Sequence, residues 1–185
     1  YAAARRDAER AVQLSPRDGE LLRRLARIEV AAVGLFRLDR AGRERIAELY
    51  RRSEKLQRTN PFVPLELAAF LLDAADPVGA RRAAERALEI EPQAVAPRLL
   101  LARAFLESGD PDRASDLIAE LKALASKHAD EARTGDYARD LLTYDPALLE
   151  QVVSGIEAAR QARSGDPTFG PENQEGRAGS DRSVD

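Results

Sequence analysis

The stretch ARRAAERALEIEP (residues 80–92) repeats, with few changes, the stretch ARRDAERAVQLSP near the start of the chain (residues 4–16). Eight of the thirteen positions are identical, and both copies end in proline. In residues 80–92, alanine recurs at spacings of three and four, at Ala80, Ala83, Ala84 and Ala87. This spacing places the alanines on one face of a helix, and its recurrence along the chain indicates an all-helical repeat fold.

Residues 62–128 extend this pattern into two helix pairs. In the first pair, apolar residues between Leu65 and Leu72 predict a helix, and Asp76-Pro77 predicts the start of the next one, because Asp caps helices and Pro favours their first turn. The second pair has the same order, with a turn at Gly109-Asp-Pro111. No stretch alternates with the period of two that a strand requires, so we expect an all-α fold.

These registers predict one repeat domain over residues 1–163, followed by a disordered tail over 164–185 that is rich in Ser, Gly, Asp and Arg. The domain divides into a half repeat (1–16), an extended repeat (17–61), two standard repeats (62–94 and 95–128) and capping helices (129–163). Within the extended repeat we expect helices from Gly19 to Leu38 and from Gly42 to Arg58. Near the end of the domain, the apolar residues between Leu148 and Ile156 share one face of a final helix.

With these registers the chain resembles the tetratricopeptide repeat family, whose helix pairs are about 34 residues long. Ala80, Ala84, Ala87 and Pro92 match the family's second helix, and the stretch from Leu67 to Leu71 matches its first helix. The resemblance covers about residues 2–127. It implies a right-handed α-solenoid, in which small residues allow neighbouring helices to cross closely.

The same resemblance implies a non-catalytic scaffold that binds a peptide or protein partner in a concave groove lined by the first helices. The groove positions that it implies are Arg23, Arg27, Phe62, Leu65, Ala69, Leu72, Leu99, Arg103 and Leu106. The subtype that grips C-terminal carboxylates has a Lys and Asn clamp in this groove, where this chain has Leu65, Ala69, Leu99 and Arg103. We therefore do not expect a receptor for chaperone tails.

A narrower resemblance gives an alternative. The run QRTNPFVP (residues 57–64), followed by a helix pair, is similar to the repeat tails of bacterial O-antigen ligase- or polymerase-type membrane proteins. Such tails lie outside the cytoplasmic membrane and belong to proteins that assemble cell-surface polysaccharide. The absence of Met and the start within a repeat suit an excised domain. The compartment is thus left open between cytoplasmic and periplasmic.

Composition argues against several other classes of function. Lys and Arg number 29 and Asp and Glu number 32, a net charge of −3, whereas nucleic-acid binders usually carry a basic excess. The chain has no cysteine and one histidine, His128, which we expect at a helix C-terminus rather than in a metal site. It also lacks a phosphate-binding loop and a dinucleotide fingerprint, so we expect no cofactor and no enzymatic activity. The longest apolar stretch, from Ile28 to Leu38, is too short and too charged to span a bilayer.

Arginines on the outer helix faces allow two interpretations. Arg81, Arg82 and Arg86 could form a strip that binds phosphate or carboxylate groups. The alternative, which we favour, is a solvated face on which these arginines pair with Glu85 and Glu89 at helical spacing. The sequence leaves the oligomeric state open, including self-assembly through an open end of the stack.

Overall fold

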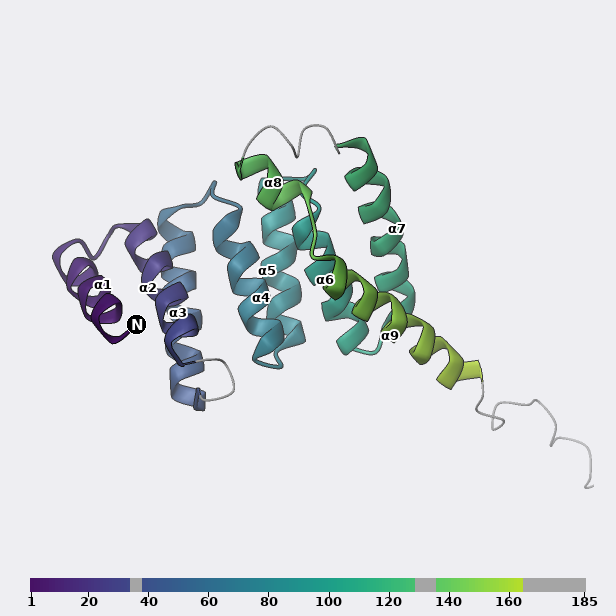
Figure 1. Ribbon diagram of the computed structural model, residues 1–185, viewed down its shortest axis with the longest axis horizontal. Coiled ribbons are helices and arrows are strands. Elements are labelled where there is room, and N and C mark those ends of the chain that lie inside the picture. Colours follow the sequence, from purple (N-terminus) through teal and green to yellow (C-terminus); the bar gives the residue numbers. More distant parts are fainter. Residues whose placement is uncertain (34–37, 129–135, 165–185) are drawn as a thin grey trace, which may run out of the picture.

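The structure is a computed structural model, which describes residues 1–33, 38–128 and 136–164. Every regular element in these ranges is a helix (Figure 1). The elements are α1 (Ala2–Leu14), α2 (Gly19–Val33), α3 (Arg40–Leu56), α4 (Phe62–Asp73), α5 (Pro77–Ile90), α6 (Ala96–Glu107), α7 (Pro111–Lys127), α8 (Asp136–Leu142) and α9 (Pro146–Ser164). Each helix from α1 to α6 packs against the helix that follows it, which confirms the predicted α-solenoid.

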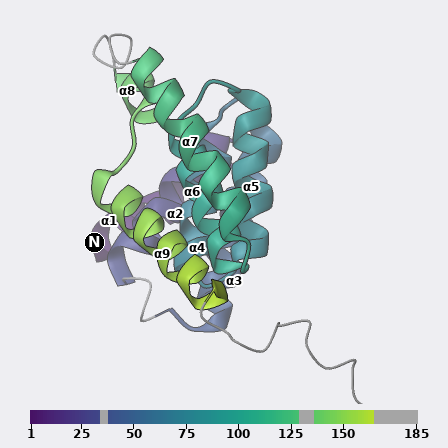
Figure 2. The same cartoon turned by 90° about the vertical axis from the view of Figure 1, so that its right-hand side faces the viewer.

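The helices form two layers, which are visible when the molecule is viewed along its long axis (Figure 2). The first helices of the pairs, α2, α4 and α6, lie on one side and the second helices α3 and α5 lie to their right, while α7 crosses in front of α6. Beyond the last pair, α9 crosses α6 and α7, and α8 packs on α6 (Figure 1).

Two helix pairs follow the same template. Both α6 and α7 begin 34 residues after the corresponding helices α4 and α5, which is the repeat length that the family resemblance implied. Alanines provide the close crossings within this template: Ala80, Ala84 and Ala87 of α5 are fully buried, and so are Ala68 of α4 and Ala102 of α6. A single methyl group at each crossing lets the backbones approach closely, and larger aliphatic side chains fill the space around it.

The extended repeat differs from its prediction. Leu38 is not helical, so the expected helix from Gly19 to Leu38 is wrong at its end; residues 34–37 lie outside the described residues. The next helix begins at Arg40, two residues before the predicted start, because Asp39 is the cap: its Oδ1 accepts the Gly42 N–H at 2.7 Å. The apolar stretch from Ile28 to Leu38 favoured a continuous helix, so the cap at Asp39 was not predicted.

The last helices close one end of the apolar core. Val152 and Ile156 of α9 are buried against Ile118 and Leu121 of α7 and Leu99 of α6. The short helix α8 is anchored by a backbone hydrogen bond of 2.7 Å between the Val95 N–H and the Leu141 carbonyl. The helix α9 extends through Ser164, a residue that the prediction placed in the tail; residues 165–185 lie outside the described residues.

The turns within the two standard pairs share one geometry. In each turn a residue with positive φ ends the first helix, Ala75 at 59° and Gly109 at 82°. The following N–H groups, of Asp76 and Asp110, reach back to carbonyls in the preceding helix at 2.8 and 2.9 Å. The Asp side chains then cap the next helix, as predicted from the Asp-Pro pairs.

The two turns predict opposite effects of matched substitutions. Ala75→Gly should raise the free energy of unfolding by about 0.5–1 kcal/mol, because a Cβ disfavours a positive φ. Gly109→Ala should lower it by a similar amount, and its effect isolates backbone strain, since an added Cβ would meet nothing within 4 Å. Urea denaturation measures both changes. Equal signs for the two substitutions would contradict this account.

Candidate partner-binding surface

A network of charges connects α2 to α4 on the first-helix side of the stack. The Arg23 guanidinium donates to both carboxylate oxygens of Glu20, at 3.0 and 3.2 Å, and to Glu66 Oε1 on α4, at 3.3 Å. Arg27, one helical turn further along α2, lies 3.9 Å from the same Glu66 oxygen and keeps 59% of its side chain exposed. Two of the predicted groove residues, Arg23 and Arg27, therefore meet at one carboxylate.

The two carboxylates of this network have opposite pKa shifts. Burial raises the pKa of Glu66, and the charges of Arg23 and Arg27 oppose this rise without cancelling it. Burial would also raise the pKa of Glu20, but hydrogen bonds from Arg23 and Arg24 outweigh it and lower the pKa. Glu66 Oε2 is buried without a hydrogen-bond partner. Ionised Glu66 is thus held at an energetic cost.

An open pocket with a volume of about 300 Å³ lies beside this network, where α4 and α6 face the segment between α8 and α9. Its residues come from both sides: Leu65 of α4, Ala96, Leu99 and Leu100 of α6, and Asp140, Thr143, Tyr144, Asp145 and Leu148 of the C-terminal segment. Aliphatic side chains from the helices meet two carboxylates on the opposite side. Such a pocket suits an apolar side chain that has a basic group near it.

The remaining predicted groove residues divide into buried and accessible ones. Leu72 and Leu99 are each only 2% exposed, so they serve the core, although Leu99 also reaches the wall of the pocket. Phe62 and Ala69 are half-buried on α4. Arg103 bridges α6 to α4, donating to Asp73 Oδ1 at 3.2 Å and to Glu107 at 2.8 Å.

The helix α9 covers the last predicted position, Leu106. An added Cβ on Gly155 of α9 would lie 2.7 Å from Leu106 Cδ2, so glycine permits α9 to approach α6 this closely. The α6 end of the first-helix surface is thus occupied by the chain itself. The accessible part is formed by α2, α4, the first turn of α6 and the α8–α9 segment, and only this part is called the first-helix surface below.

Sequence reasoning missed Glu66 and the contribution of the α8–α9 segment. Glu66 follows Leu65 directly and has the charge opposite to the two predicted arginines, but nothing in the sequence pairs residues 43 positions apart. Asp145 precedes Pro146 in the same way as the predicted caps, and its carboxylate accepts the Ala147 N–H at 2.9 Å at the start of α9. Its position beside the pocket follows from how α9 folds back, which no local pattern encodes.

Other candidate residues stand close to their expected positions. His128 follows the last residue of α7, and its Nε2 is 3.4 Å from the Gln93 side-chain oxygen. Arg86 pairs with Glu89 at 2.8 Å, and Arg81 is 3.8 Å from Glu85 and 5.6 Å from the Phe105 ring centroid. Residues 1–33, 38–128 and 136–164 hold no cluster of three metal-ligating side chains, nor a helix long and apolar enough to cross a bilayer.

The raised pKa of Glu66 predicts how stability changes with pH. A carboxyl whose folded-state pKa lies above its unfolded value stabilises the fold at low pH and loses this contribution as pH rises through the folded pKa. Glu66→Gln has no carboxyl group to ionise, so it does not lose this contribution as pH rises. The free energy of unfolding of the variant minus that of the parent should therefore increase between pH 4 and pH 7. Urea denaturation at both pH values measures the difference, with the exposed Glu44→Gln as the control. A difference that falls with pH would contradict the prediction.

Comparison with known proteins agrees with this architecture. Residues 71–134 match the tetratricopeptide repeat family. The fold is similar to the crystal structure of a thermophilic TPR protein from Thermus thermophilus, with a TM-score of 0.59 and 18% sequence identity, over 83% of this chain and 72% of that one. No curated protein matches the chain. The matched repeat and the 34-residue spacing of the helix pairs thus agree in identifying residues 71–134 as tetratricopeptide-type repeat sequence, and the neighbouring structure shows the same kind of fold.

Proposed function

We propose that this chain is a scaffold that binds a peptide segment of a protein partner on the first-helix surface, between α2 and the α8–α9 segment. The observation that carries the proposal is the pocket between α4, α6 and that segment, which has an aliphatic floor and a carboxylate edge. Tetratricopeptide repeats serve in general as protein-interaction scaffolds. This supports a role in binding rather than in catalysis.

The chemistry of the surface indicates what the segment carries. An aliphatic side chain would fill the pocket against Leu65 and Leu100, and a neighbouring Lys or Arg would face Asp140 and Asp145. Toward α2, the exposed Arg27 offers a cation to an acidic residue further along the segment. The surface thus has an acidic and a basic end, which would fix the direction in which a segment binds.

The alternative role, as the extracytoplasmic repeat domain of an O-antigen ligase- or polymerase-like protein, stays a prediction. It places the same partner-binding surface in a protein whose active site lies elsewhere. The parent sequence before Tyr1 tests it: about ten apolar stretches of membrane-spanning length would support it. A parent that begins a few residues before Tyr1 would exclude it.

Substitutions on the first-helix surface should abolish binding without unfolding the chain. Peptides would first be selected on the parent protein by phage display, and their affinities measured by fluorescence anisotropy. Leu65→Asp should weaken binding by at least about tenfold, since a carboxylate would be desolvated in the pocket.

The matched control is Val78→Asp, which introduces the same group at a residue of α5 that is 49% exposed. Arg27→Glu and the exposed Arg82→Glu of α5 form a second pair for the basic end. Circular dichroism verifies that helicity is unchanged. Selected peptides that bind Leu65→Asp and Arg27→Glu as tightly as the parent would refute the placement of the site.

A further inference from the structure

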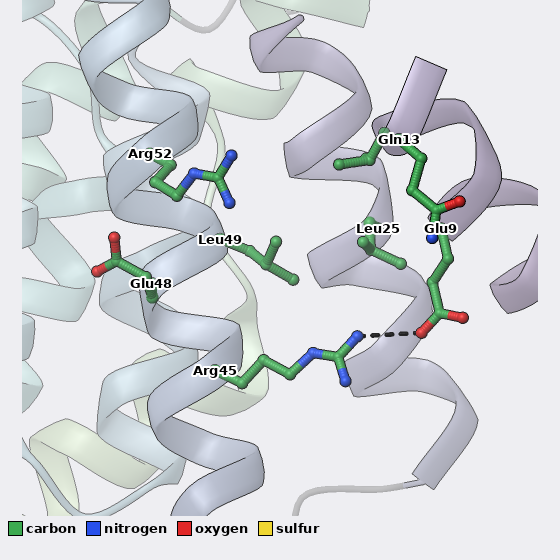
Figure 3. A pocket seen from close by; sticks show the side chains of 8 residues that line it. Glu9, Gln13, Leu25, Arg45, Glu48, Leu49 and Arg52 are labelled. Carbon is green, nitrogen blue, oxygen red and sulfur yellow. Dashed lines mark hydrogen bonds and ion pairs between the residues drawn. The ribbon is translucent and has the colours of Figure 1, made fainter. Parts of the chain in front are cut away.

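A second cleft opens on another part of the molecule, between α1 and α3 (Figure 3). Its volume is about 460 Å³, within the range of sites that hold ligands or peptide side chains. Leu25 of α2, Leu49 of α3 and Val12 of α1 contribute its apolar part. No residue that lines this cleft also lines the pocket between α4, α6 and the α8–α9 segment, so the cleft is a separate feature.

One end of the cleft is closed by ion pairs. The Arg45 guanidinium of α3 reaches across to Glu9 of α1 at 3.0 Å (Figure 3). The same nitrogen is 2.9 Å from the buried Glu29 of α2. Arg5 of α1 adds a contact of 3.2 Å to Glu9. The charges at this end are therefore paired within the chain, so this end attracts neither a cationic nor an anionic ligand strongly.

The other end of the cleft carries an unmatched cation. Arg52 of α3 lines the cleft one helical turn beyond Leu49, and Figure 3 shows its side chain on the side that faces α1 and α2. Among the residues that the structure describes, Arg52 has no ion pair and no hydrogen-bond partner. Glu48, one helical turn before Arg52 on α3, also lines the cleft, but its Oε2 lies 3.8 Å from Arg51 and Figure 3 shows its carboxylate directed away from α1. An unpaired guanidinium beside an apolar surface suits a ligand in which an apolar residue stands next to a carboxylate.

The packing of α1 leaves this cleft accessible. No residue of α1 is fully buried, and Val12 and Ala8 are its half-buried contacts with the core. In the equivalent stretch of α5, Ala80, Ala84 and Ala87 are fully buried. The helix that borders the cleft is thus less tightly packed than its repeat counterpart, so a ligand that contacts both Val12 and Leu49 would add apolar contacts that the chain lacks.

We propose that the cleft between α1 and α3 is a second docking site, which binds a peptide segment with an apolar residue beside an acidic one. The apolar side chain lies on Leu25, Leu49 and Val12, and the carboxylate pairs with Arg52. This ligand is acidic, whereas the pocket beside Asp140 and Asp145 suits a basic one. The two surfaces therefore select different segments.

The test uses two fluorescein-labelled 12-residue peptides, one of alternating Leu and Glu and one of alternating Leu and Lys, with the full chain. Fluorescence anisotropy gives each dissociation constant. Arg52→Glu should weaken binding of the Leu/Glu peptide by about tenfold and strengthen binding of the Leu/Lys peptide. Arg51→Glu is the matched control, since it makes the same change of charge on the adjacent, exposed residue of α3 and should change affinity by less than about twofold.

A third variant separates this proposal from the proposed function. Leu65→Asp alters the first-helix surface and should leave binding of the Leu/Glu peptide unchanged. Loss of that binding in Leu65→Asp would overturn the second site. The proposal would also be overturned if the Leu/Glu peptide failed to bind at about 1 mM, or if Arg52→Glu and Arg51→Glu weakened it equally.

Discussion

The crossing of α5 with its two neighbours is the contact on which the rest of the structure depends. Ala80, Ala84 and Ala87 have no exposed surface, and α5 packs against both α4 and α6. A larger side chain at any of these positions would separate two helix pairs, because interiors of this kind have no room for extra methylene groups. No helix pair can bury its apolar face alone, so the stack holds together through such crossings between neighbours.

The same crossings shape the surface on which we propose that partners bind. They set α4 and α6 side by side in one layer, so that Leu65 and Leu99 reach a common pocket and Glu66 reaches the arginines of α2. At the far end, α9 packs on α6 and α7 in place of a further pair and covers Leu106. The accessible surface is therefore shorter than the row of first helices, with Asp140 and Asp145 at one end and the exposed Arg27 at the other.

Local signals in the sequence predicted the fold because they report local geometry. The alanine and proline registers at residues 80–92 and the caps at Asp76 and Asp110 each act within one or two helical turns. Asp39 was missed because the apolar stretch before it imitated a continuing helix. The candidate site was only partly predictable, since Glu66 and Tyr144 join it through contacts between distant residues, and burial of Leu72 depends on packing between helices.

We propose that partners bind on the first-helix surface while the stack of helices stays folded and unchanged. Hydrogen–deuterium exchange of the full chain, measured with and without a bound, phage-selected peptide, tests this proposal. We expect the peptide to slow exchange in α2 and α4 and in the segment that joins α8 to α9, and to leave exchange in α5 and α7 unchanged. Slower exchange in α5 and α7, with none in α2 and α4, would contradict it.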